Sequence, residues 1–170
     1  MISRTWRLSA FLLALVAAGA VFILKYEYEN PVSSVAESIP DTALARHYFL
    51  KADSLLNWSS FDSSIAYFQK ARALYEKDGN HAGQIDCQTM IAENYRYKGE
   101  YRIAADLFNK SIADGITNLG EKNSSVATAY NKLGLVQWAL GKNDSALSNF
   151  EKALALRKEL LGEQHVDVGW

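Results

Sequence analysis

Histidine and cysteine are the residue types in this 170-residue sequence best suited to metal binding or nucleophilic catalysis. The three histidines, His47, His81 and His165, lie far apart, and none forms the His-x3-His pair typical of a zinc site. Cys87 is the only cysteine, which excludes a Cys-x2-Cys metal motif and an intrachain disulfide. It falls in a predicted helix, where a structural thiol is the favoured interpretation. These residues indicate neither a metal site nor a catalytic centre.

Phosphate-binding and hydrolase motifs are also missing from the sequence. It contains no glycine-rich phosphate loop and no Gly-x-Ser-x-Gly elbow. The net charge is -1 and the pI is about 6.3, so the excess of positive charge that nucleic-acid binding requires is lacking. We therefore expect a protein that is not an enzyme, with no cofactor, no metal ion and no nucleic-acid partner.

Residues 1–29 form the most hydrophobic part of the chain. Arg4 and Arg7 precede an uncharged run over residues 8–24. The run is just long enough for an uncleaved transmembrane signal anchor, with the N-terminus in the cytoplasm. Ala18 and Ala20 offer a cleavage site for a signal peptide, but the apolar run continues past it. We favour the anchor over the cleaved signal, and both over a buried helix of a soluble protein.

This N-terminal element predicts where the rest of the protein lies. With an anchor, the protein is a single-pass cell-membrane protein whose folded part is outside the cytoplasm, in the periplasm if the source is bacterial. With a cleaved signal, it is secreted or periplasmic. Residues 30–40 then form a linker to the folded part, which occupies residues 41–170.

The folded part contains an internal repeat of about 40 residues. The repeat is visible when Ser59, Gly99 and Gly141 are superposed. The same shifts superpose small residues and phenylalanines, namely Ser64 with Ala104 and Ala146, Phe68 with Phe108 and Phe150, and Ala71 with Ser111 and Ala153. A small–x3–Phe–x2–small frame repeated three times indicates an array of similar structural units.

The sequence of each copy predicts two helices, because its apolar residues recur at helical spacing. The first helices are expected at about 41–57, 82–98 and 124–140, and the second helices at 61–77, 101–118 and 143–161. Asp41, Asp62 and Asn143 are predicted N-caps. Gly99 and Gly141 are predicted to end first helices with a positive φ.

These features resemble the tetratricopeptide repeat. The third copy carries Tyr130, Leu133 and Gly134 in its first helix, and Ala146, Phe150 and Ala153 in its second. The tail Arg157-Lys158-x-x-Leu161-Gly162-x-x-His165 and the long period are similar to the kinesin-light-chain-like subclass. The resemblance implies an all-α fold, a right-handed α-solenoid of antiparallel helix pairs. Its copies span about 41–80, 81–122 and 123–164, and a truncated fourth begins at 165, all preceded by the N-terminal hydrophobic helix.

In proteins of this kind the first helices line a concave surface that binds a peptide or a partner protein. The resemblance implies that this surface includes Phe49, Leu50, Asp53, Thr89, Glu93, Arg96, Tyr97, Asn131, Lys132, Leu135 and Trp138. Asn131 and Lys132 are candidates for binding a carboxylate, because an amide and an ammonium group both donate hydrogen bonds. Arg96 and Tyr97 are candidates for a charged and a stacking contact. Trp138 has a second interpretation, as a residue covered by the following repeat.

Two functions are compatible with the sequence. The first is a protein–protein interaction scaffold, exported or membrane-anchored, which we favour. The second is the sensory or substrate-recruiting N-terminal part of a larger bacterial signalling or protease protein. Its output domain would be a histidine kinase, a transcriptional regulator or a caspase-like protease. We expect the sequence to be a fragment, because the fourth copy stops soon after it starts and no polar capping helix follows.

Overall fold

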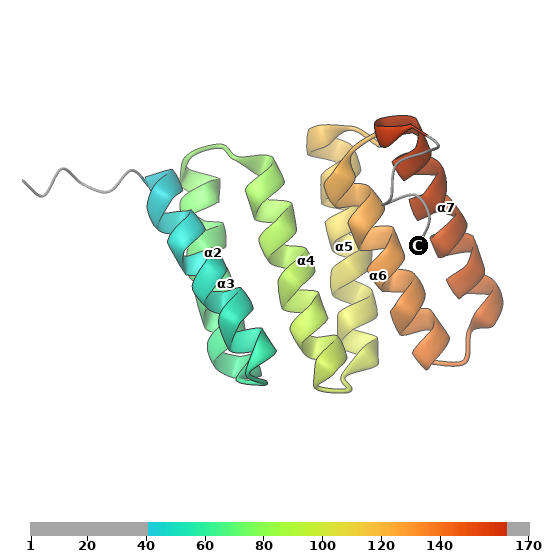
Figure 1. Ribbon diagram of the computed structural model, residues 1–170, viewed down its shortest axis with the longest axis horizontal. Coiled ribbons are helices and arrows are strands. Elements are labelled where there is room, and N and C mark those ends of the chain that lie inside the picture. Colours follow the sequence, from blue (N-terminus) through green and yellow to red (C-terminus); the bar gives the residue numbers. More distant parts are fainter. Residues whose placement is uncertain (1–40, 163–170) are drawn as a thin grey trace, which may run out of the picture. The chain divides into compact units, whose positions relative to one another are not determined.

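The computed structural model describes residues 41–162, and within them the chain is all α-helical. The helices are α2 (Asp41–Asn57), α3 (Phe61–Lys77), α4 (His81–Tyr97), α5 (Tyr101–Leu119), α6 (Ser124–Ala139) and α7 (Asn143–Leu161) (Figure 1). These bounds agree with the predicted helices to within one residue. The N-terminal hydrophobic segment, the linker and the start of a fourth copy lie outside the described residues. Within them, no helix is long and apolar enough to cross a membrane.

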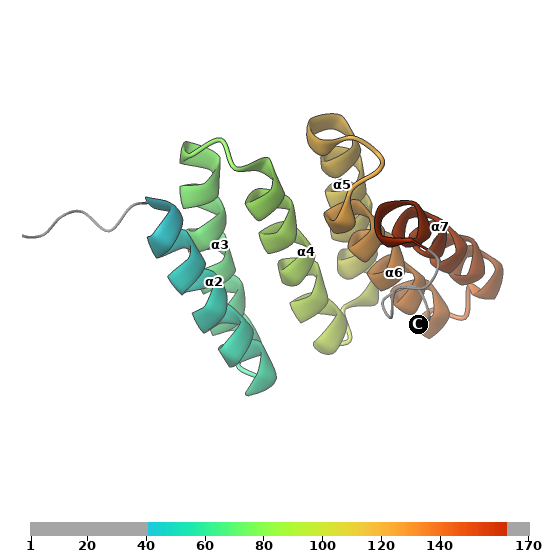
Figure 2. The same ribbon diagram turned by 45° about the horizontal axis from the view of Figure 1, so that its top comes forward.

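The six helices form three antiparallel pairs, α2–α3, α4–α5 and α6–α7. Each helix contacts the next one along the chain, so the pairs stack in order (Figures 1 and 2). Helices further apart in sequence also meet, and the closest of these pairs are α4 with α6 and α2 with α4. The first helices of the pairs therefore lie nearer to one another than the second helices do. We call the surface of α2, α4 and α6 on this side the inner face.

The turn within each pair has the same backbone geometry. The amide of Gly99 donates to the carbonyl of Arg96, and the amide of Glu100 donates to that of Tyr95, which is a Schellman motif. Gly99 has φ +80° and Gly141 has φ +73°, as predicted for these two residues. Ser59 occupies the same position in the first pair with φ +57°, where a side chain is disfavoured.

The three predicted N-caps are wrong. Asp41 is the first residue of α2 and not the residue before it. Asp62 is the second residue of α3, and Asn143 is the first residue of α7. Both therefore lie in the first turn of their helix and not at the N-cap position before it. The side chains that do cap helices are Asn80, which accepts a hydrogen bond from the amide of Gly83, and Asn123, which accepts one from Ser125. Both stand between pairs, where the chain enters a first helix.

The core consists of small residues and phenylalanines at the predicted positions. Phe68 and Phe108 are fully buried, and Ala146 and Ala153 are nearly so. Phe150 is half-buried, because within the described residues no further helix pair covers the third copy. A methyl group built on Gly134 would lie 2.6 Å from Cε1 of Phe150, so glycine is required where α6 meets α7.

Candidate functional site

The inner face carries a cluster of three charged residues that joins α4 to α6. Glu93 is only 4% exposed, and its carboxylate accepts hydrogen bonds from Arg96 and Lys132. The distances are 2.7 Å from Arg96 Nε, 2.9 Å from Arg96 Nη2 and 2.9 Å from Lys132 Nζ. Glu93 is thus held by two cations, one on its own helix and one on the neighbouring first helix.

The pKa values of Glu93 and Arg96 are both shifted in the direction that favours the charged form of the side chain. Burial acts to raise the pKa of Glu93, but the hydrogen bonds and charges of Arg96 and Lys132 outweigh it, so the net pKa is lowered. The hydrogen bond to Glu93 raises the pKa of Arg96. Both shifts favour the charged forms of Glu93 and Arg96. With one acidic and two basic side chains, the cluster has a formal net charge of about +1.

Tyr97 extends the cluster with an aromatic surface. The Arg96 guanidinium carbon lies 4.2 Å from the centre of the Tyr97 ring, which is a cation–π contact. The ring is also parallel to that of Phe61, with the two centres 6.4 Å apart. Tyr97 and Trp138 are both more than half exposed. Arg96 and Tyr97 thus place a cation and an exposed aromatic ring side by side on α4.

The other residues predicted for the inner face do not join this cluster. Phe49 is half-buried and packs edge-on against Phe68, with ring centres 5.1 Å apart. Asp53, Asn131 and Leu135 are half-buried, and within residues 41–162 the side chains of Asp53 and Asn131 make no hydrogen bond or ion pair. Leu50 is exposed on α2. Thr89 is buried, and its Oγ1 has no hydrogen-bond partner within the described part of the chain.

A second polar link between α4 and α6 was not predicted from the sequence. The hydroxyl group of Ser125 donates a hydrogen bond to Asp86 Oδ1 over 2.6 Å. Burial raises the pKa of Asp86, and the hydrogen bond from Ser125 offsets part of that shift. Ser125 is 39 residues from Asp86, as Lys132 is from Glu93. That separation is close to the repeat length of about 40 residues, so the repeat in the sequence could have indicated both contacts.

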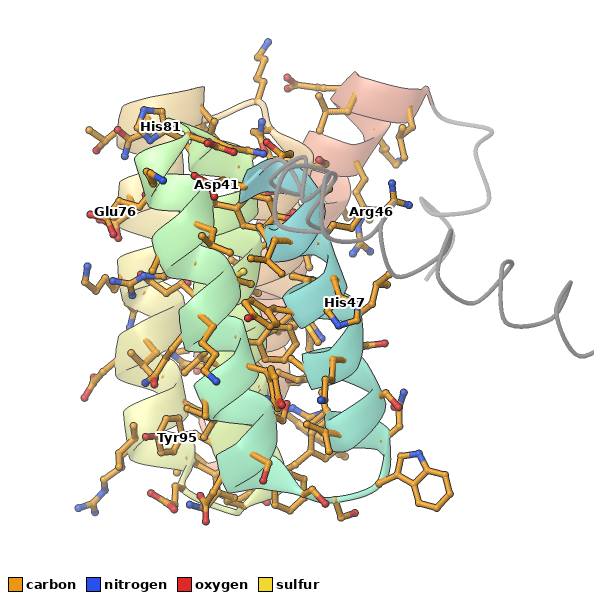
Figure 3. The ribbon with its side chains drawn as sticks, turned by 90° about the vertical axis from the view of Figure 1, so that its left-hand side faces the viewer. Asp41, Arg46, His47, Glu76, His81 and Tyr95 are labelled. Carbon is orange, nitrogen blue, oxygen red and sulfur yellow. The ribbon has the colours of Figure 1, made fainter. Side chains whose placement is uncertain are left out.

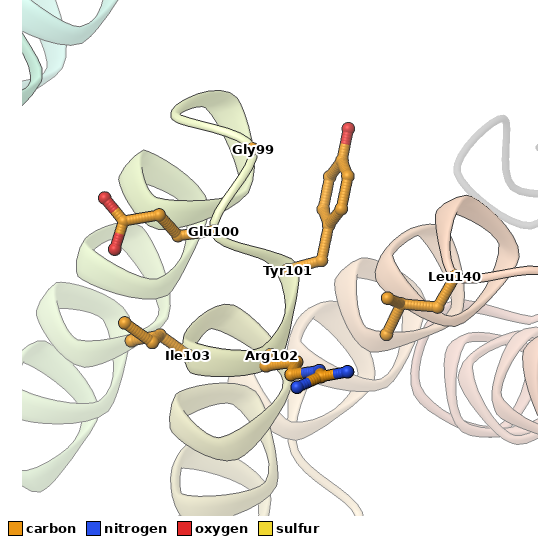
Figure 4. Close-up of a pocket in the computed structure, with 6 residues that line it drawn as sticks. All are labelled: Gly99, Glu100, Tyr101, Arg102, Ile103 and Leu140. Carbon is orange, nitrogen blue, oxygen red and sulfur yellow. The ribbon is translucent and has the colours of Figure 1, made fainter.

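A pocket of about 380 Å³ lies at the start of α5, beside the end of α6. It is lined by Gly99, Glu100, Tyr101, Arg102, Ile103 and Leu140, and Figure 4 shows Tyr101 and Leu140 on facing sides. Tyr101 corresponds to Phe61 of the first copy, which stacks on Tyr97. The residue corresponding to Tyr97 is Ala139, so no ring covers Tyr101 in the second copy. The smaller residue explains why a pocket opens here.

The residues first considered for chemistry lie apart. His47 is on α2 and His81 begins α4, and they lie on different sides of the molecule (Figure 3). Within residues 41–162, no group of three or more histidine, cysteine or acidic side chains could hold a metal ion. Cys87 is fully buried, and burial raises the pKa of its thiol to about 12. Such a thiol is a poor nucleophile. His165 lies outside the described residues.

Stacked antiparallel helix pairs joined by repeated turns define the class of α-helical repeat proteins. Within this class, models described as "Tetratricopeptide repeat" match residues 41–114 and 126–167, together more than half of the chain. The chain belongs to the tetratricopeptide repeat family.

A solved structure and two curated sequences are similar to the chain. The crystal structure of BtubC (BKLC) from P. vanneervenii superposes with a TM-score of 0.62 and 20% sequence identity. The match covers 85% of this chain and 64% of that one, and at this identity it shows the fold alone. Clustered mitochondria protein homologs from Culex quinquefasciatus and Aedes aegypti are each 34% identical over 67 residues. That match covers 39% of this chain and 5% of theirs, so it spans a small part of those proteins.

Proposed function

We propose that the chain binds a peptide segment of a partner protein along the inner face, and that it acts by binding rather than by catalysis. The observation that carries this proposal is the cluster of Glu93, Arg96 and Lys132, which joins α4 to α6 on that face. Membership of the tetratricopeptide repeat family supports it, because repeats of this family suggest protein–protein interaction.

The cluster has hydrogen-bond donors left over for a ligand. Arg96 has five N–H donors and Lys132 has three, and Glu93 engages only some of them. Both cationic side chains are about one-fifth exposed. Because Glu93 fixes their positions, they lose little conformational freedom when they donate to a peptide carbonyl or carboxylate. The rings of Tyr97 and Trp138 offer apolar contacts beside them.

A peptide-display selection against the 170-residue chain tests this proposal. We expect enriched peptides that carry an acidic residue near apolar residues, because the cluster has a net positive charge. The amide NMR signals perturbed by such a peptide should belong to α4 and α6, including Arg96, Asn131 and Lys132. Perturbations confined to α3, α5 and α7 would contradict the proposal, as would the enrichment of no peptide.

We also propose that the protein is a single-pass membrane protein with its repeats outside the cytoplasm, or an exported protein after signal cleavage. The basis is the uncharged run over residues 8–24 behind Arg4 and Arg7, which lies outside the described residues. Expressed with an intact signal, an anchored chain should stay with membranes at alkaline pH, whereas a chain released by signal cleavage should be found in the periplasmic or secreted fraction. A chain found only in the cytosolic fraction would contradict this placement.

A further inference from the structure

Two contacts join the start of α3 to the end of α4, a place that we call the first junction. The rings of Phe61 and Tyr97 are stacked with an angle of 1° between them and their centres 6.4 Å apart. Beside them, Lys98 Nζ lies 2.9 Å from Asp62 Oδ1. A pair of stacked rings and an ion pair thus occupy the first junction.

The second junction, between the start of α5 and the end of α6, lacks the stacked rings. By the repeat alignment, Tyr101 corresponds to Phe61 and Ala139 corresponds to Tyr97. The methyl group of an alanine cannot replace a ring. Within residues 41–162, one face of the Tyr101 ring is therefore left without an aromatic partner.

The second junction lacks the ion pair as well. Arg102 stands where the first junction has Asp62, and Leu140 stands where it has Lys98. A guanidinium group and a leucine side chain cannot form an ion pair. The pocket of about 380 Å³ is the space that these two changes and the missing ring leave, with Tyr101 and Leu140 on its facing sides (Figure 4).

We propose that this pocket binds the aromatic ring of a tyrosine side chain from a partner protein, in the place that the Tyr97 ring has in the first junction. Tyr101 supplies the ring on which the ligand stacks. Leu140 and Ile103, which is 45% exposed, supply apolar contacts around it. An aliphatic side chain would cover the same apolar surface without the stacking contact, so the pocket favours a ring.

The pocket is separate from the charged cluster of the inner face. It is lined by the turn between α4 and α5, the first residues of α5 and the residue that follows α6. Glu93, Arg96 and Lys132 do not line it. Binding of a ring in the pocket therefore does not depend on the binding of a peptide along the inner face.

The test uses N-acetyltyrosinamide, an uncharged molecule that carries one tyrosine side chain, as a probe. In NMR titrations of the 170-residue chain in mild detergent, it should shift the amide signals of Tyr101, Ile103 and Leu140. Ala139→Tyr restores the missing ring and should weaken probe binding at least about fivefold. Ala139→Ser is the matched control, which leaves the pocket open and should bind the probe as the native chain does.

A second variant moves the pocket to the first junction. Tyr97→Ala, Asp62→Arg and Lys98→Leu together give the first junction the residues of the second. The probe should then also shift the signals of Phe61, which it leaves unchanged in the native chain. Circular dichroism shows whether each variant keeps its helices.

Four results would overturn the proposal. They are equal binding of the probe by the folded Ala139→Tyr variant, equal binding of N-acetylleucinamide by the native chain, and no new site at Phe61 in the folded triple variant. The fourth is binding of the probe only after Trp170→Ala, which would mean that the last ring of the chain itself occupies the pocket.

Discussion

Lys132 Nζ lies 2.9 Å from Glu93 Oε1, and this contact ties the first helix of the third copy to that of the second. Glu93 is buried, so removing its cationic partners would leave an unpaired buried carboxylate and destabilise the fold. The two cations proposed to bind ligand are therefore also structural partners of Glu93. An experiment that removes them alone would mix a loss of binding with a loss of folding.

Acid should weaken the fold partly through Glu93. Because its pKa is lowered in the folded state, the unfolded chain takes up a proton first as the pH falls. The stabilisation is fully present above the unfolded value of about 4.3 and is lost as the pH falls through the folded value. Urea unfolding at pH 7 and pH 3 should show a larger loss for the native chain than for Glu93→Gln. Equal losses would show that this carboxylate does not contribute.

Gly134→Ala should destabilise the protein, because the added methyl group would lie 2.6 Å from the Phe150 ring. We expect a cost of about 1–3 kcal/mol from overpacking, which exceeds the gain of about 1 kcal/mol in helix propensity. Thermal unfolding followed by circular dichroism measures it. Adding Phe150→Leu should recover part of the loss, since a smaller side chain leaves room for the methyl group. A double variant less stable than the sum of both changes would contradict this steric account.

Ser59→Gly should stabilise the protein. Ser59 has a positive φ at the position that glycine occupies in the other two turns within pairs. A left-handed conformation costs a residue with a side chain about 1 kcal/mol, and glycine does not bear that cost. The melting temperature should therefore rise, and Gly99→Ser should lower it by a similar amount. A decrease for Ser59→Gly would mean that the serine side chain makes a compensating contact.

The Cys87 thiol should be unreactive in the folded protein. It is fully buried and its pKa is raised to about 12, so both access and thiolate formation are suppressed at pH 8. An aromatic disulfide reagent should modify it slowly in the native chain and fully in urea. Fast labelling of the native chain would show that α4 opens readily.

The helices and their turns could be predicted from the sequence because the signals are local. Small residues and phenylalanines recur at helical spacing, and Gly99 and Gly141 mark the ends of first helices. The N-caps at Asp62 and Asn143 were mispredicted because a polar residue fits both at the cap and in the first turn. Asn80 and Asn123 differ only in standing one residue before the helix.

The inner face was harder to predict, because its contacts depend on how neighbouring copies are placed. The helical pattern put Glu93, Arg96 and Lys132 on one surface, but gave no indication that Glu93 is buried between the other two. It also treated Lys132 as paired in function with Asn131, whereas its partner is one repeat earlier. Contacts at the repeat distance, such as that of Asp86 with Ser125, follow only from the stacking.

The most direct test of peptide binding by the inner face is the affinity of a selected peptide, measured by fluorescence anisotropy. The variant combines Glu93→Gln, Arg96→Gln and Lys132→Gln, so that no buried charge is left unpaired. We predict at least about a tenfold loss of affinity, as expected when charge-assisted hydrogen bonds are removed. The matched control, Lys110→Gln with Asp114→Asn, removes an ion pair on α5 and should bind the peptide as the native chain does. Unchanged affinity in the folded triple variant would contradict the proposed binding surface.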